Sequence, residues 1–344
     1  MKRKTFSTLL VIAGSVALLN LLGSWKYKPG PAGSAEIKQS ASKALLLLQK
    51  SGYIFINNTR TKCASCHHNT LTSMATEIAQ RKGIPVIDSL SGANIAAMER
   101  DLVAVCNPNL TNQFLAGVNF GEPYLLVGLA AEKYKPNFIT DIAVDYLMSQ
   151  VKADGSFLAE SGRDPMETGD IHLTALAIRS IQLYASAAKQ DKVNQLVAGT
   201  RTWLESQQTG QQQELCFQLL GLHWCGSSEA HKNEIGGKIK AMQNADGGWS
   251  QLPTLKSDAY ATGQALYALY ESGVEKTAGA VYQKGLEYLL KTQEADGSWF
   301  VATRSFPIQP FVNSDFPPYD ENQFISAAGT NWAVMALLNA LPDL

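Results

Sequence analysis

The chain has 344 residues, of which 45% are hydrophobic and 17% are charged, and its formal net charge is −1. A chain of this length can bury a large core. The near-neutral charge, without a dense Lys/Arg run beyond the first residues, excludes electrostatic binding of nucleic acid.

The first residues have the pattern of an export signal. Lys2, Arg3 and Lys4 precede an uncharged apolar stretch at 8–23, which is typical of a secretory leader. This stretch is shorter than the roughly 20 apolar residues of a membrane-spanning helix. Residues 1–35 are therefore predicted to form either a cleaved signal peptide or a membrane anchor with a linker. Both place the protein in the bacterial periplasm or on the outer face of the inner membrane.

Residues 36–119 have a helical pattern and carry a Cys-x-x-Cys-His motif formed by Cys63, Cys66 and His67, with His68 directly after it. In c-type haem attachment the two cysteines form thioethers and the adjacent histidine ligates the iron. Two intervening residues allow both sulfurs to reach the porphyrin edge. The motif predicts haem c on Cys63 and Cys66, with His67 as axial ligand. Export agrees, because this haem is attached outside the bacterial cytoplasm.

Other chemistries fit the same residues. Zinc could be held by Cys63, Cys66 and either His67 or His68, with a fourth ligand from elsewhere. A redox disulfide or a structural disulfide could join Cys63 to Cys66. At most two of the remaining three cysteines can pair within the chain: Cys106, Cys216 and Cys225.

The sequence does not assign a sixth iron ligand. Met74 lies seven residues after His67, so on a continuous helix it shares the face of His67 and cannot reach the other side of the haem plane. Met74 is therefore predicted to be a core residue. An open sixth position favours ligand binding or peroxide chemistry, and a filled one favours electron transfer. The distant candidates are Met166, His172, His223 and His231.

An internal repeat dominates the rest of the chain. Residues 243–249 read Gln-Asn-Ala-Asp-Gly-Gly-Trp, and residues 293–299 read Gln-Glu-Ala-Asp-Gly-Ser-Trp. Weaker copies occur at 150–157, where Phe replaces Trp, and at 203–208. Each clear copy ends an apolar helical run with an Asp-Gly turn. Repeats separated by roughly 35–55 residues predict stacked helix pairs.

Small residues crowd the helix that follows each turn. Ala261, Ala265 and Ala268 recur at helical spacing after Asp258, which is an N-cap signal. Similar sequences, rich in small residues, occur at 170–177 and 327–337. Helices with small faces can approach closely, so these segments are predicted to form an inner ring.

A Gln followed by x-x-Asp-Gly-Gly/Ser-Trp at helix-pair spacing resembles the repeat of squalene-hopene cyclases and protein prenyltransferase β subunits. The resemblance covers about residues 120–341, and residues 36–119 match only by helical pattern. It implies an α/α toroid with a central cavity, in which Gln and Trp brace each pair against the next. The predicted fold is thus all-α: one toroid of five to six helix pairs, with 36–119 continuous with the repeat region 120–344.

The chain lacks the catalytic motifs of both families. It has no Asp-x-Asp-Asp string, the acid motif of hopene-type cyclases, which argues against cyclisation started by protonation. The prenyltransferase zinc site is incomplete, because Glu214 and Cys216 have no His partner on the later inner helices. Weak catalytic candidates are Asp170, His172 and Asp258 near the starts of inner helices, where capping by the two aspartates is the alternative.

Two functions remain open from the sequence. The first is an exported c-type haem protein on a toroid scaffold, performing electron transfer or haem-based redox chemistry with a partner protein. The second is an exported toroid that binds or transforms a terpenoid or other small apolar ligand, with a structural zinc or disulfide at 63–68.

Overall fold

A computed structural model describes residues 33–112, 118–160, 162–305 and 312–343. The predicted leader at 8–23 lies outside the described residues. Among the described helices, none combines the length and apolarity needed to cross a membrane. The described chain from Gly33 onward forms one compact unit.

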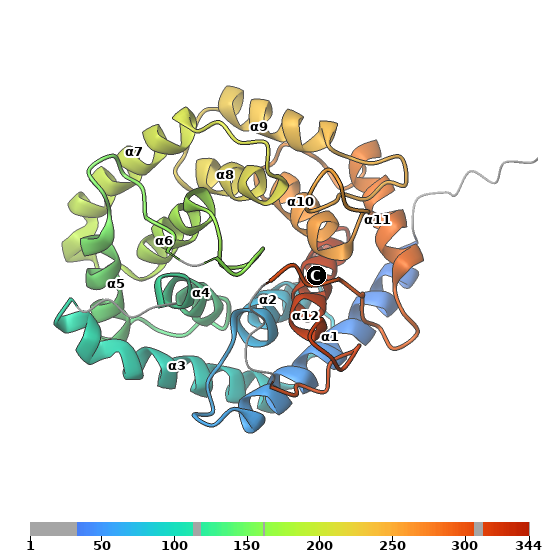
Figure 1. Cartoon of the computed structure of the whole chain (residues 1–344), viewed down its shortest axis with the longest axis horizontal. Helices are drawn as coiled ribbons and strands as arrows, with labels where there is room; N and C mark the ends of the chain where they lie inside the picture. The colour runs from blue at the N-terminus through green and yellow to red at the C-terminus, as the bar shows by residue number, and fades with distance from the viewer. Residues whose placement is uncertain (1–32, 113–117, 161, 306–311, 344) are drawn as a thin grey trace, which may run out of the picture. The chain divides into compact units, whose positions relative to one another are not determined.

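The described residues contain twelve α-helices that alternate between an outer and an inner ring (Figure 1). Neighbouring inner helices pack on one another around the whole circle, including α12 on α2. This arrangement confirms the predicted all-α toroid, with six helix pairs. The outer helices are α1 (Ser34–Asn58), α3 (Asp88–Leu110), α5 (Phe138–Gln150), α7 (Gln190–Ser206), α9 (Glu229–Ala241) and α11 (Ala280–Thr292). The inner helices are α2 (Leu71–Arg81), α4 (Val118–Ala131), α6 (Asp170–Tyr184), α8 (Gln212–Trp224), α10 (Ala259–Glu271) and α12 (Gln323–Asn339).

The inner helices are buried almost all round, as their small residues predict. Ala261, Ala265 and Ala268 of α10 are fully buried. Gly263 allows the closest approach, because a Cβ there would lie 2.4 Å from the carbonyl carbon of Trp332 in α12. Small residues thus set the distance between neighbouring inner helices.

Each repeat tryptophan joins an outer helix to the next inner helix. The Trp249 indole donates to the carbonyl of Ile239 (2.7 Å), and its backbone N–H donates to Thr262 Oγ1 (2.9 Å). Trp299 repeats both bonds, to Leu289 (2.8 Å) and to Thr330 Oγ1 (3.1 Å). Both indoles are buried, so their N–H groups need these partners.

The repeat glutamines link successive outer helices. Gln243 Nε2 donates to the carbonyl of Val281 in α11 at 2.8 Å. Gln293 Nε2 donates in the same way to the carbonyl of Ser40 in α1, at 3.1 Å. The second bond connects the last repeat to the first helix. The brace that stacks the pairs therefore also closes the ring.

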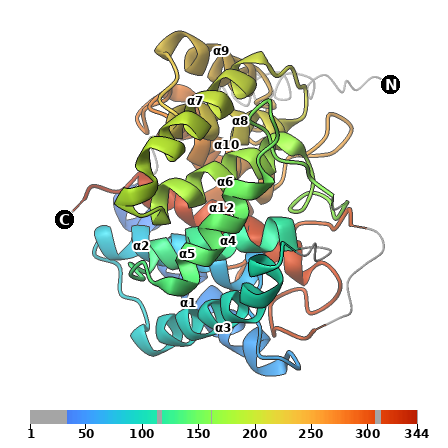
Figure 2. The same cartoon turned by 90° about the vertical axis from the view of Figure 1, so that its left-hand side faces the viewer.

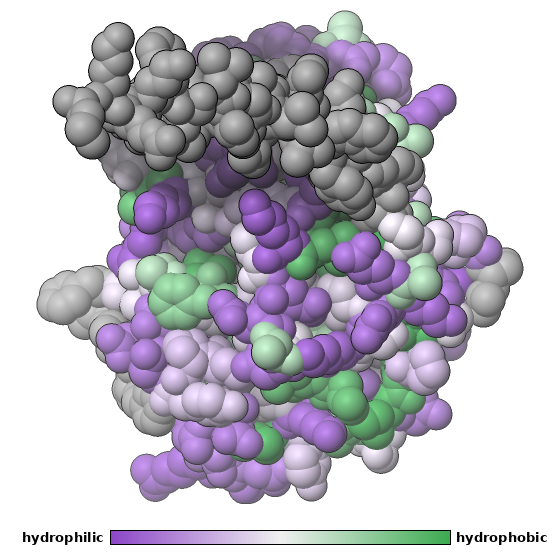
Figure 3. All heavy atoms as spheres, turned by 90° about the vertical axis from the view of Figure 1, so that its right-hand side faces the viewer, coloured by the Kyte–Doolittle hydropathy of each residue, from purple (hydrophilic) through white to green (hydrophobic). Residues whose placement is uncertain are grey.

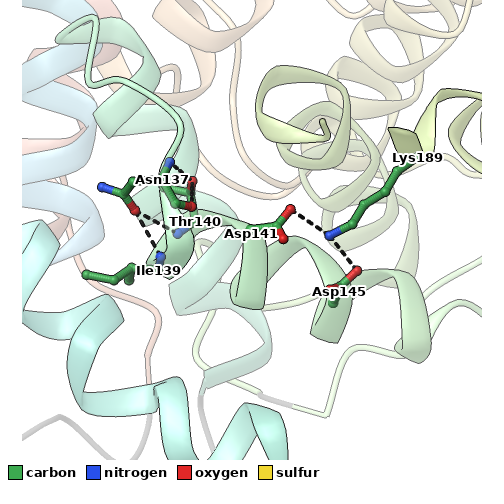
Figure 4. A network of polar contacts seen from close by, with 6 residues as sticks. All are labelled: Asn137, Ile139, Thr140, Asp141, Asp145 and Lys189. Atoms are coloured by element: carbon green, nitrogen blue, oxygen red, sulfur yellow. Dashed lines mark hydrogen bonds and ion pairs between the residues drawn. The ribbon is translucent and has the colours of Figure 1, made fainter. Parts of the chain in front are cut away.

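Polar contacts on the outside fix α5 against the start of α7. Asn137 and Thr140 form a reciprocal capping box at the N-terminus of α5. Lys189 then contacts Asp141 (2.6 Å) and Asp145 (2.7 Å) of the same helix (Figure 4). Figure 2 shows α5 and α7 on the same face of the ring. Exposed ion pairs of this kind contribute at most about 1 kcal/mol each.

The outer helices expose their polar sides. In α11 the buried residues form one stripe, Tyr282, Gly285, Leu286 and Leu289, as expected for a helix with one face on a core. The described residues on the face in Figure 3 accordingly mix hydrophilic and hydrophobic areas.

Candidate functional site

Three neighbouring cavities lie where inner helices begin, at one mouth of the ring. The cysteine cavity, of about 320 Å³, is lined by residues 63–67 together with Phe55, Leu125 and Phe324. The glutamine cavity, of about 380 Å³, is lined by residues 211–213 with Tyr260 and Arg304. A connecting cavity of about 60 Å³ shares His67 and Phe324 with the first and Asp164 and Pro165 with the second.

Cys63 and Cys66 both lie half-buried on the wall of the cysteine cavity. Cys66 opens a π-helical turn, Cys66–Thr70, that runs directly into α2. The turn is held by Thr70 Oγ1, which donates to the carbonyl of Cys66 at 2.9 Å. Burial, followed by the negative charge of Glu167, raises the pKa of the Cys66 thiol well above its usual range. Cys66 is therefore a neutral thiol in the protein as described.

His67 faces the cavity between an aromatic ring and a second histidine. Its ring stacks on Phe324 with centroids 4.8 Å apart. Its Nδ1 lies 2.7 Å from Nδ1 of His68 and 3.1 Å from Ser65 Oγ. Burial lowers the pKa of His67 to about 3, so the imidazole is neutral. Because both contacts use Nδ1, Nε2 is the nitrogen left for an external ligand.

His68 is fully buried behind His67 and stacks on Phe55 at 5.1 Å. Its pKa is lowered by burial and then by His67. Among the described residues its Nε2 has no hydrogen-bond partner. The backbone here is held from α12, because Asn331 Nδ2 donates to the carbonyl of His67 at 2.9 Å.

The donors of the cysteine motif lie together on one wall of the cysteine cavity. Cys63 and Cys66, which two residues separate in the sequence, share this wall with the neutral imidazole of His67. The Nε2 atom of His67 makes neither of the contacts described above. In the described part of the chain, no three His, Cys, Asp or Glu side chains converge as a metal site. All five cysteines, including Cys106, Cys216 and Cys225, carry free thiols.

Carboxyl groups on α3 and α4 face the same cavity. Asp101 accepts from the backbone N–H of Ala64 at 2.8 Å, and burial raises its pKa to about 6. Glu122 is fully buried beside Asn109, which donates to it, and burial raises its pKa to about 7. Arg163 lines the cavity too and pairs with Glu167 at 2.5 Å.

The three weak catalytic candidates do not line the cysteine cavity. Asp258 is the N-cap of α10: it accepts from the N–H of Ala261 at 2.8 Å, and burial raises its pKa to about 6. Asp170 begins α6 and accepts from the N–H of Ala159 at 2.8 Å. Asp258 therefore caps its helix, as the capping alternative requires. Asp170 does not: the N-cap of α6 is Gly169, and the Asp170 carboxylate binds a backbone N–H outside α6.

His172 lies inside the ring, among aromatic side chains. Its Nε2 is 2.9 Å from the hydroxyl of Tyr124, and its ring stacks on Phe217 with centroids 3.8 Å apart. Burial lowers its pKa to about 3. These contacts make His172 a neutral, packed core residue.

Of the distant iron-ligand candidates, Met166 is the one that the fold brings to His67, because both line the connecting cavity. Met74 was predicted to be a core residue, but it is half-buried and lines a separate cavity with the C-terminal parts of inner helices, because this stretch of α2 borders that cavity. His231 lies on α9 beside Glu205, at 3.1 Å. His223 lies near the C-terminus of α8.

Several site residues were not singled out from the sequence. Asp101, Glu122, Arg163 and Phe324 come from four separate segments, and none belongs to a motif. Packing of the next helix pair brings Asp101 and Glu122 to the cysteine turn, and ring closure brings Phe324 of α12 there.

Comparison with known proteins supports the fold. No protein-family model matches the chain, and no curated protein matches its sequence. Among solved structures, the type II terpene cyclase MstE from Scytonema is 13% identical, with a TM-score of 0.61 over 91% of this chain and 100% of that one. A protein from Actinoplanes is 14% identical, with a TM-score of 0.57 over 87% and 100%. At this level of identity the likeness shows the toroid fold alone.

Proposed function

We propose that the mouth of the toroid binds a small apolar ligand of terpenoid type. The observation that carries this proposal is the lining of the cysteine cavity. Phe55, Leu125 and Phe324 provide an apolar and aromatic wall beside polar groups that include Arg163 and Glu122. Small-molecule sites typically combine an apolar, aromatic lining with polar groups that fix the orientation of the ligand.

The fold neighbour adds support of a general kind. MstE was solved with geranylgeranyl dihydroxybenzoate as substrate and with merosterolic acid A as product. The α/α toroid can therefore hold an isoprenoid. Cyclisation is not part of the proposal, because the chain lacks an Asp-x-Asp-Asp string and Asp258 serves as the N-cap of α10.

The residues at the cavity divide into two roles. Phe324 and Phe55 hold the two neutral histidines in place and offer ring faces to an apolar ligand. Glu122, with a pKa of about 7, and Asp101, with a pKa of about 6, are able to give or take a proton near neutral pH.

The direct test is calorimetric titration of the described unit with geranylgeraniol. Binding should weaken on Phe324→Ala, by about tenfold, since roughly 1.5–3 kcal/mol accompanies the burial of a large apolar side chain. Phe300→Ala is the matched control, because Phe300 is 53% exposed and lines none of the three cavities at this mouth. Equal affinities for all three proteins, or no binding, would overturn the proposal.

A second candidate is a c-type haem protein, favoured by the shared wall of Cys63, Cys66 and His67. Cys63 and Cys66 would hold the group by thioether bonds, and Nε2 of His67 would be its axial ligand. When bound, haem would supply one-electron transfer or peroxide chemistry. His68 and Phe324 would orient the His67 ring through the contacts described above.

Haem attachment is tested by staining a denaturing gel and recording a pyridine haemochrome spectrum, after export in a host with c-type maturation machinery. Stain that survives denaturation and is lost in the Cys63→Ala/Cys66→Ala variant would establish haem c and the exported location. A colourless protein with one equivalent of zinc, or with none, would reject it.

A further inference from the structure

The glutamine cavity has a polar lining that an apolar ligand does not need. The first turn of α8 contributes Gln212 and Gln213, and the turn before α10 contributes Gln251. Gln212 and Gln213 are 1% and 8% exposed. Buried amides of this kind cost free energy unless their donors and acceptors are paired.

The amide oxygen of Gln212 is an unpaired acceptor among the described residues. Gln212 Nε2 donates to the carbonyl of Ala261 at 2.9 Å, which fixes the side chain. Its Oε1 has no partner among the described residues. Gln213, by contrast, is fully engaged, with the hydroxyl of Tyr260 donating to its Oε1 at 2.6 Å. The wall of the cavity therefore includes a buried amide oxygen that is unpaired among the described residues.

The charges of the cavity cancel one another. Arg304 Nε donates to Gln251 Oε1 at 2.8 Å, and its guanidinium lies 3.5 Å from a carboxylate oxygen of Asp164. Gln251 is held in turn by Asp258 at 3.0 Å. Because cation and anion are already paired, the cavity favours an uncharged polar group over an ion.

The connecting cavity lies between this polar end and the apolar end, and shares Asp164 and Pro165 with one and His67 and Phe324 with the other. From these shared walls we infer that the ligand is amphipathic. Its apolar tail lies at Phe324, and an uncharged head bearing hydroxyl or amide donors lies in the glutamine cavity. This inference rests on the proposed binding of an apolar ligand.

The test compares three probes with the same six-carbon tail: hexyl β-glucoside, 1-hexanol and hexyltrimethylammonium, each titrated calorimetrically. Hexyl glucoside should bind at least tenfold more tightly than either of the others. Gln212→Met and Arg304→Met should each remove most of that advantage while leaving the 1-hexanol affinity unchanged. Gln190→Met, on the exposed start of α7, is the matched control.

The outcomes separate the two proposals. If 1-hexanol and hexyl glucoside bind equally, and both weaken on Phe324→Ala, the apolar site stands and the polar head site is overturned. Tighter binding of hexyltrimethylammonium would also overturn the uncharged head. If no probe binds, the apolar ligand proposal itself fails. Because Gln212→Met removes a buried hydrogen bond, Arg304→Met at the less buried rim supplies the second, independent variant.

Discussion

At the scale of single residues, the mouth of the ring concentrates ionisable groups in places where water is excluded. His67 and His68 are neutral because burial lowers their pKa values. Burial raises the pKa values of Asp101 and Glu122 toward neutral pH. Near neutral pH the two histidines are thus uncharged and Glu122 is only partly ionised, which lowers the charge that faces a ligand.

Glu122 gives a pH-dependent prediction. Its folded pKa is about 7, against an ordinary value of 4.5, so the folded state binds the proton more tightly and loses stability as pH rises between these values. Glu122→Gln removes this loss. The variant's free energy of unfolding, relative to wild type, should rise by roughly 1–3 kcal/mol from pH 4.5 to pH 7.5. Urea unfolding at several pH values measures it, and a constant difference would contradict burial of the charge.

The residues of the site were only partly predictable from the sequence. Cys63, Cys66 and His67 were found because they are adjacent and form a motif. Asp101 and Phe324 reach the same cavity from helices far apart in the chain, and only tertiary packing brings them there. The Asp258 cap was recognisable because a cap is a local interaction. Capping by Asp170 was a wrong alternative, because its carboxylate binds the N–H of Ala159 outside α6.

At the scale of elements, the sequence predicted the helix pairs because turn and helix signals repeat. It did not predict the π-helical turn at Cys66–Thr70. That turn depends on Asn69 Nδ2, which donates to the carbonyl of Gly52 in α1 (3.2 Å) and to Asn94 in α3 (2.9 Å). Such contacts with two other helices leave no local sequence signal.

Two glycines should respond oppositely to the same change. Gly263→Ala should destabilise the protein by about 1–3 kcal/mol or more, because the new methyl group would meet the α12 backbone. Gly92→Ala, on exposed α3, has no atom within 4 Å of the added methyl group. It should stabilise the protein by up to about 1 kcal/mol, since alanine favours helix. Thermal unfolding of both variants compares them, and equal effects would contradict the close α10–α12 contact.

At the scale of the whole molecule, the predicted toroid is confirmed, and the structure shows how the ring closes. Lys43 of α1 contacts the carbonyl of Ala295 in the last repeat turn, next to the bond from Gln293 to Ser40. The sequence could not show that α1 receives this brace, because residues 36–119 lack the repeat motif. The partner is recognised through its backbone carbonyl, which leaves no sequence trace.

Because the ring is closed, the bond from Gln293 to α1 should stabilise the protein as much as the bond from Gln243 to α11. Gln293→Ala and Gln243→Ala each remove two hydrogen bonds to backbone carbonyls. Each should lower the free energy of unfolding by about 1–3 kcal/mol, and urea unfolding should remain a single transition in both. A separate early transition in Gln293→Ala alone, followed by fluorescence and circular dichroism, would show that the first and last pairs separate independently.

The bond from Gln293 to Ser40 also limits how such a protein can vary in length. An open stack of repeats gains or loses a unit at little cost, since each unit needs only its neighbours. In a closed ring every pair must turn the chain by the same share of a full circle, so adding or deleting one pair would leave a gap or an overlap at the α1–α12 junction. The number of pairs is therefore fixed by geometry. Diversity in this architecture has to come from substitutions and from the loops at the two mouths.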